Sequence, residues 1–123
     1  MLVFADAHKD FNSETKIWLP QGKGAYESIE ARDILYVEAE NHHLHIFLKG
    51  QNQQTIKSSL KDFYARSLEG FSYLKKVGRS HIVNIKRIER VENNRLIMEG
   101  NHSIPIPRDR KDEVLRDVGI KGE

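Results

Sequence analysis

The side chains in this sequence that are suited to binding chemistry are cations gathered in the middle of the chain. Residues 57–90 carry nine basic and three acidic side chains, a net charge of +6, whereas residues 1–56 sum to −3 and residues 91–123 to −1. Arginine can donate two parallel hydrogen bonds to a guanine edge, and lysine neutralises a phosphate as a point charge. This distribution predicts one face that meets an anionic polymer such as nucleic acid. Six cations in or beside short strands and turns are expected to form most of this face: Lys75, Lys76, Arg79, Lys86, Arg87 and Arg90.

A second group combines histidines and carboxylates around residue 42. In a strand, His43 and His45 share one face, as do Glu38 and Glu40, while His42 points the other way. Two imidazoles on one face can begin a zinc site, but a third ligand is needed and none follows closely in sequence. We favour polar residues at a strand end over a metal site, and expect neither a metal nor another cofactor. A small metal-dependent enzyme using His43, His45 and Glu38 or Glu40 remains an alternative.

Other kinds of catalytic site find little support in the sequence. The absence of cysteine excludes a thiolate nucleophile, a disulfide framework and cysteine-ligated metals. Ser80 and His81 are neighbours, so a strand would point them to opposite sides and they cannot form a local dyad. We therefore expect no enzymatic activity and no small-molecule substrate. No apolar run approaches the roughly 20 residues of a membrane span, and we expect a cytoplasmic protein with no membrane partner.

The scaffold that must position these side chains is predicted to be mainly β. Short apolar runs alternate with turn signals at intervals of roughly 8–12 residues, which is typical of short antiparallel strands. The strands begin at Lys16, and residues 108–118 can form a short last helix. We expect one domain over residues 16–118, preceded by an arm or linker at residues 1–15 and followed by a tail at 119–123.

One stretch has the period of a helix instead. Leu60, Phe63, Tyr64 and Leu68 fall on one face of a helix over residues 59–69. The Ser59 hydroxyl can accept a hydrogen bond from a backbone N–H at the helix start, and Gly70 is expected to end the helix in the left-handed conformation. We expect this central helix to be covered by Phe71.

Four segments resemble motifs of the LytTR-type DNA-binding domain, in the family's order and spacing. The resemblance extends over about residues 16–118, and four weak matches in register make a strong signal. The segments are residues 33–39 (DILYVEA), 59–63 (SLKDF), 75–84 (KKVGRSHIVN) and 104–108 (IPIPR).

The resemblance implies both a fold and a function. The fold would be an elongated, LytTR-like arrangement of short antiparallel strands and small sheets with one central helix. The function would be sequence-specific binding of double-stranded promoter DNA in transcription regulation, through loops that read major grooves. Such domains are usually the output half of two-component response regulators, often on tandem sites that two copies share. No receiver domain precedes residue 16, so we expect a stand-alone regulator or a separated output domain.

The resemblance also implies which residues contact DNA. His42, Arg79 and Arg108 would contact bases, with the two arginines donating to guanines in successive major grooves. A histidine in this place predicts affinity that rises as the pH falls, because imidazolium is the better donor. Phosphates would be held by Asn41, His43, Lys57, Ser59, Lys76, Ser80 and Arg110. Val83 is expected in the core, and Asn84 is expected to tie the loop backbone.

Two positions depart from the family pattern, and one further function stays open. Gly78 stands where the family usually has histidine, and Pro107 stands where it usually has serine, so both changes affect the expected sequence preference. The alternative is an RNA- or protein-binding β-domain that uses the same cations with aromatic platforms. It would require Tyr64, Phe71 and Tyr73 to be exposed.

Overall fold

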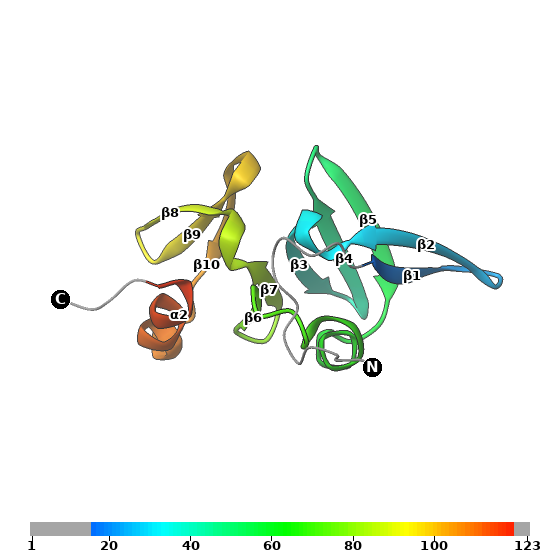
Figure 1. Cartoon of the computed structure of the whole chain (residues 1–123). Helices are drawn as coiled ribbons and strands as arrows, with labels where there is room; N and C mark the ends of the chain where they lie inside the picture. The colour runs from blue at the N-terminus through cyan, green and yellow to red at the C-terminus, as the bar shows by residue number, and fades with distance from the viewer. Residues whose placement is uncertain (1–15, 120–123) are drawn as a thin grey trace, which may run out of the picture.

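The computed structural model describes residues 16–119 of the chain. The predicted arm and all but the first residue of the predicted tail lie outside this range, so these domain boundaries stay predictions. The described strands form three antiparallel sheets that follow one another along an elongated molecule (Figure 1). This arrangement confirms the mainly β fold predicted from the sequence.

The largest sheet has five strands and lies in the middle of the molecule. Its strand order is β5-β4-β3-β7-β6, so β3 is central and pairs with strands from two separate parts of the chain. The chain reaches it through a 3-10 turn, η1 (Ala31–Asp33). The strands are β3 (Ile34–Glu40), β4 (His43–Leu48), β5 (Asn52–Lys57), β6 (Leu74–Val77) and β7 (His81–Asn84).

Two smaller sheets flank the central one. A two-stranded ribbon, β1 (Lys16–Gly22) and β2 (Ala25–Glu30), projects at one end (Figure 1). At the other end, β8 (Ile88–Glu92), β9 (Arg95–Met98) and β10 (His102–Pro105) form a sheet in the order β10-β9-β8. Strand β10 is an edge strand, which suits its Pro105, because proline has no N–H to donate to a second neighbouring strand. The short 3-10 segment η3 (Ile85–Arg87) leads from β7 of the central sheet to β8, and η4 (Glu99–Asn101) connects β9 to β10.

The central helix begins as the sequence predicts but ends differently. Helix α1 (Leu60–Phe63) continues as a π-helical turn, η2 (Tyr64–Leu68), and the Ser59 side chain accepts a hydrogen bond from the Asp62 N–H at 3.1 Å. The prediction that Gly70 ends the helix in the left-handed conformation is wrong. The wide turn closes with the Glu69 N–H donating to the Tyr64 carbonyl, and Glu69 itself stays right-handed.

Two hydrophobic cores meet on β3. Ile34 and Val37 pack into a core with the helix and the β1–β2 ribbon, whereas Leu35 and Tyr36 pack into a second core with the three-stranded sheet and the last helix. An irregularity in the pairing between Ile34 and Tyr36 interrupts the strict alternation, which lets adjacent residues face the same core. Strand β3 is therefore buried on both faces and holds the two halves of the molecule together.

Candidate nucleic-acid interface

The turn between β3 and β4 presents His42 to solvent. Asn41 and His42 have φ values of 51° and 66°, and Glu40 pairs with His43 across the turn. Two consecutive left-handed residues are typical of a tight hairpin turn, and asparagine and histidine tolerate this conformation better than most side chains. The His43 Nδ1 lies 2.9 Å from the Asn41 carbonyl oxygen and donates to it. The local sequence thus forms a tight turn with the His42 imidazole exposed.

The start of the helix lies beside this turn. Ser58 donates a hydrogen bond from its hydroxyl to the Ser59 carbonyl at 3.1 Å, and Ser59 caps the helix. Lys57, the last residue of β5, and Lys61, in the first helical turn, are both exposed. Hydroxyls and ammonium groups are therefore available together at this corner.

A third turn, between β6 and β7, carries Arg79 and Ser80, which are exposed. The Ala39 N–H donates to the Ser80 carbonyl at 2.8 Å and so attaches this turn to the end of β3. Lys76 lies half-buried on β6 just before the turn. The Arg79 guanidinium therefore projects from a segment whose backbone is held close to the β3–β4 turn.

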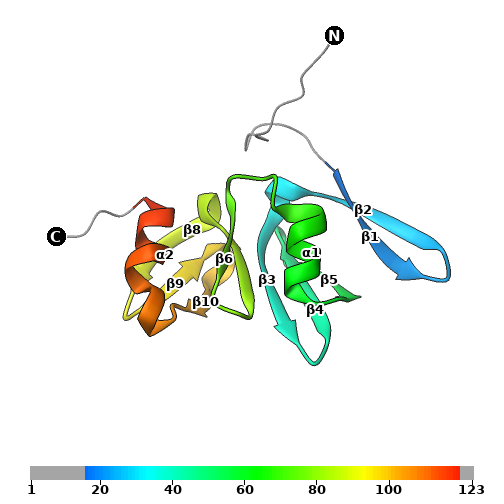
Figure 2. The same cartoon turned by 90° about the horizontal axis from the view of Figure 1, so that it is seen from below.

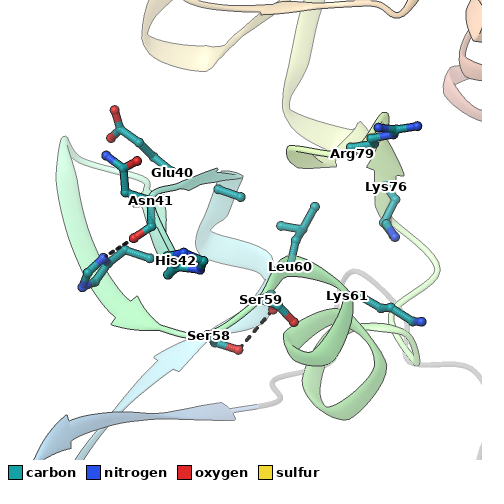
Figure 3. A pocket seen from close by; sticks show the side chains of 11 residues that line it. Glu40, Asn41, His42, Ser58, Ser59, Leu60, Lys61, Lys76 and Arg79 are labelled. Atoms are coloured by element: carbon teal, nitrogen blue, oxygen red, sulfur yellow. Dashed lines mark hydrogen bonds between the residues drawn. The ribbon is translucent and has the colours of Figure 1, made fainter.

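These three segments enclose one hollow of about 460 Å³. Asn41 and His42 lie on one side of it and Lys76 and Arg79 on another, with the helix start between them (Figure 3). Among the described residues, the only carboxylate in its lining is Glu40, whose Oε1 accepts a hydrogen bond from His45 at 3.1 Å. The charge of the hollow is therefore mainly positive. Its full lining is Ala39, Glu40, Asn41, His42, His43, Ser58, Ser59, Leu60, Lys61, Lys76 and Arg79.

Arg108 lies outside this hollow but close to it. It begins a 3-10 turn, η5 (Arg108–Arg110), that leads into helix α2 (Lys111–Val118), and its side chain is exposed. The preceding residue, Pro107, touches the β6–β7 turn: a Cβ built on Gly78 would lie 2.9 Å from the Pro107 Cγ. Since consecutive Cα atoms are about 3.8 Å apart, the Cα atoms of Arg79 and Arg108 are separated by no more than about 15 Å.

The three base-contact candidates consequently share one rim of the molecule. In Figure 2 the β3–β4 turn, the β6–β7 turn and the segment from β10 to α2 all lie along the lower edge. Arg79 occupies the middle of the series, since its turn adjoins the His42 turn on one side and the Arg108 segment on the other.

All the predicted phosphate contacts except Arg110 lie in or beside the first hollow. Asn41, His43, Ser59 and Lys76 line the hollow, whereas Lys57 and Ser80 are exposed next to its lining residues. Arg110 is different, because its Nε donates to Glu113 Oε1 at 3.1 Å. This bond and the Glu113 charge raise the Arg110 pKa, and the same bond and the Arg110 charge lower the Glu113 pKa.

The structure adds two lysines that the sequence did not single out. Lys61 lines the hollow from the first turn of the helix. Lys111 joins Arg108 and Arg95 around a second hollow of about 480 Å³ beneath the Asn93–Asn94 turn. The position of Lys61, two residues after the helix cap Ser59, was a usable signal. Lys111 stands three residues after Arg108, but its place beside Arg95 had no local signal, because Arg95 belongs to the β8–β9 hairpin.

The residues that the alternative functions require are placed unfavourably for those functions. Within residues 16–119, no group of three histidine or acidic side chains is arranged to hold a metal ion. His45 is paired with Glu40, and His81 is paired with Glu38 at 3.2 Å. Phe71 and Tyr73 are buried, each only 2% exposed, so neither can act as a stacking platform, and Phe71 packs with the helix as expected.

The structure also bears on membrane association. Over the described residues, no helix is both long and apolar enough to cross a membrane.

Comparison with known proteins agrees with the fold. Residues 24–118 match the family model of the LytTr DNA-binding domain. Among solved structures, the chain is similar to one described as the LytTr DNA-binding domain of a methyl-accepting/DNA response regulator from Bacillus cereus. The two are 18% identical with a TM-score of 0.66, and the match covers 88% of this chain and 100% of that one. No curated protein sequence matches the chain.

Proposed function

Because the chain belongs to the LytTR family of DNA-binding domains, we propose that its rim of three turns reads the sequence of double-stranded promoter DNA. The observation that carries this proposal is the convergence of the His42, Ser59 and Arg79 segments on one mainly cationic hollow, with the Arg108 segment in contact beside it. DNA binding in transcription regulation is the function of the family; the roles of individual residues are our inference.

The chemistry of each side chain suggests its role on the DNA. Arg79 and Arg108 are exposed guanidinium groups on turns, which allows each to approach a guanine edge and donate two hydrogen bonds. His42 can donate to an acceptor-rich groove or accept from a base amine, depending on its protonation. The remaining groups would hold phosphates and so fix the position of the protein along the duplex. They are Asn41, His43, Lys57, Ser59, Lys76, Ser80 and Arg110, to which we add Lys61.

The spacing of the two arginines changes one expectation from the sequence. Successive major grooves on one face of B-DNA are about 34 Å apart. The Cα atoms of Arg79 and Arg108 are at most about 15 Å apart, so we no longer assign these two side chains to successive grooves. We propose instead that they read bases within one helical turn, with His42 extending the contacts on the other side of Arg79.

We further propose the setting in which this domain works. It would act as the output domain of a two-component response regulator, or as a stand-alone regulator of the same kind, in the cytoplasm where promoter DNA is accessible. Two copies would occupy tandem sites. The domain would work by binding alone, without catalysis.

The test combines selection of duplexes from a random pool with two substitutions. Wild-type protein is expected to enrich a defined motif. Arg79→Ala should weaken binding to that motif by about 1–3 kcal/mol and relax the preference at one base pair. Lys57→Ala should weaken binding to all duplexes alike and reduce the dependence of log affinity on log salt concentration by about 1.

Lys49→Ala is the matched control. Lys49 is also an exposed lysine, but it follows β4 at the end opposite the His42 turn, roughly 20 Å away along the strand. Its removal should leave both affinity and salt dependence unchanged. If Arg79→Ala and Lys57→Ala lose affinity equally for the selected and the random duplex, the assignment of roles is wrong.

A further inference from the structure

The contact between Gly78 and Pro107 joins two segments that belong to different sheets. Gly78 follows β6 of the five-stranded sheet, and Pro107 follows β10 of the three-stranded sheet. Gly78 has a φ of 72°, and a Cβ on it would lie only 2.9 Å from the Pro107 Cγ. The pyrrolidine ring therefore occupies the place that a side chain at residue 78 would need.

Both residues also limit the freedom of the backbone at this point. The left-handed conformation of Gly78 is one that glycine adopts readily and other residues adopt at a cost. Pro107 has a φ of −58°, which its ring holds near that value. Arg79 and Arg108 each come directly after one member of this pair. A shift in the contact therefore moves both arginine backbones relative to each other.

Resting on the proposed function, we propose that the Gly78–Pro107 contact is a spacer that sets the separation of the two arginines on the DNA. These two positions would then determine sequence preference although neither side chain contacts a base. Bidentate recognition needs donor and acceptor atoms within hydrogen-bond distance, about 2.7–3.2 Å, so a displacement of even part of an ångström changes which base edges fit.

The contact also gives a single account of two features of the sequence. Gly78 and Pro107 are the positions at which the chain departs from the motifs that it otherwise resembles. Because the two residues touch, the departures amount to one local change: two polar side chains are absent and the turns approach each other closely. We expect the preferred DNA sequence to depend on the pair and not on either residue alone.

The experiment changes the spacer without changing either arginine. In Gly78→Ala, the new methyl group would overlap the proline ring, so one turn must move. In Pro107→Ala, the ring that separates the turns is removed. For each variant, duplexes are selected from a random pool, and affinities for the wild-type motif and for a random duplex are measured. Each variant should bind the wild-type motif about tenfold more weakly, keep its affinity for random duplex within about twofold, and enrich a motif with altered spacing between the bases read.

Gly24→Ala is the matched control for backbone strain. Gly24 has a φ of 77°, and among the described residues no atom lies within 4 Å of a Cβ built there. Its substitution imposes the same left-handed strain without a clash, and the selected motif should be that of the wild type. In the double variant Gly78→Ala/Pro107→Ala the proline ring is absent, so there is no clash. Relative to Pro107→Ala, the alanine at residue 78 should therefore lower the melting temperature only as much as Gly24→Ala lowers that of the wild type.

The outcomes separate this proposal from the function it rests on. If the wild type enriches a motif and both spacer variants enrich the same motif with the same spacing, the spacer role is wrong and the DNA-binding role stands. If the wild type enriches no motif, the proposed function fails and the spacer role fails with it. Should Gly78→Ala not fold, Pro107→Ala carries the test alone, since it removes atoms and adds none.

Discussion

His42 illustrates how one residue can combine a strained backbone with an exposed side chain. Its φ of 66° lies in the left-handed region, where most L-residues are disfavoured by about 1–2 kcal/mol. The turn nevertheless keeps an imidazole here, at the mouth of the hollow that also contains Arg79. Residues held in a disfavoured conformation are common at functional sites, which fits the base contact that we propose for His42.

His42→Gly separates the contact from the turn. Glycine adopts the left-handed conformation readily, so stability should be unchanged or raised by up to about 1 kcal/mol. Affinity for the selected duplex should fall by about 1–3 kcal/mol. Thermal melts and fluorescence anisotropy measure the two effects; equal affinity of the two proteins for the selected duplex would exclude His42 as a contact.

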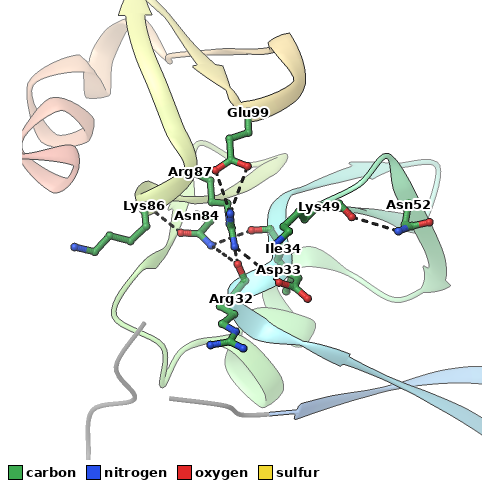
Figure 4. Close-up of polar contacts among 9 residues, drawn as sticks. All are labelled: Arg32, Asp33, Ile34, Lys49, Asn52, Asn84, Lys86, Arg87 and Glu99. Carbon is green, nitrogen blue, oxygen red and sulfur yellow. Dashed lines mark hydrogen bonds and ion pairs between the residues drawn. The ribbon is translucent and has the colours of Figure 1, made fainter. Parts of the chain in front are cut away.

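At the scale of the elements, side-chain links fasten the start of β3 to the end of β7 and to the segment that follows β7, at the ends of these strands opposite the rim turns. Asn84 at the end of β7 is fully buried; its Nδ2 donates to the Ile34 carbonyl at 3.0 Å and to the Arg32 carbonyl at 3.4 Å, and its Oδ1 accepts from the Lys86 N–H at 2.9 Å (Figure 4). Arg87 adds a hydrogen bond to the Arg32 carbonyl and an ion pair with Glu99. The tying role predicted for Asn84 is confirmed, as is the burial of Val83.

Asn84→Ala tests this link. It leaves buried backbone groups of β3 and η3 without their partners, so the free energy of unfolding should fall by about 2–3 kcal/mol, measured by urea denaturation. The control is Asn52→Ala, an exposed asparagine whose Nδ2 donates to the Lys49 carbonyl at 3.3 Å, and it should change stability by less than about 0.5 kcal/mol. Similar urea midpoints for both variants would show that the buried amide does not hold the strands.

At the scale of the whole molecule, aromatic side chains fill the two cores that β3 joins. Tyr36 stacks on Phe47 with ring centroids 4.4 Å apart, and its hydroxyl lies 3.2 Å from the Nδ1 of His102. Burial and the Glu38 carboxylate raise the pKa of Tyr36. Burial is also the main cause that raises the pKa of Tyr64 and of Tyr73 in the other core. Folding therefore favours the protonated form of tyrosines in both cores.

Alkaline pH should consequently destabilise the fold. A tyrosine whose pKa is raised on folding contributes stability that is fully present below its ordinary pKa of 10.0 and is lost as the pH rises through the raised value. Urea midpoints should therefore fall above about pH 10, with tyrosinate absorbance rising as the protein unfolds. Tyr36→Phe should show a smaller decline over the same range. Complete ionisation of the tyrosines near pH 10 in a protein that remains folded would contradict this account.

Much of the fold could be predicted from local patterns. The Ser59 cap and the buried helix face of Leu60 and Phe63 depend on residues a few positions apart, and both are observed. The motif segments likewise pointed to the family. The helical segment ends close to the predicted residue, and only the left-handed conformation expected of Gly70 is wrong, because the last turn is a π-helical one that the Glu69 N–H closes onto the Tyr64 carbonyl.

The amino-acid sequence alone predicted which cations stand on turns, since turn chemistry and charge are local properties, and its resemblance to LytTR motifs implied which of these residues would contact DNA. Which of them share a surface was decided by tertiary structure. Pairing of β3 with β7 joins residues more than 40 positions apart, and the contact of Gly78 with Pro107 joins two sheets. Such contacts arise from the packing of whole strands, so the neighbouring residues in sequence carry no signal of them.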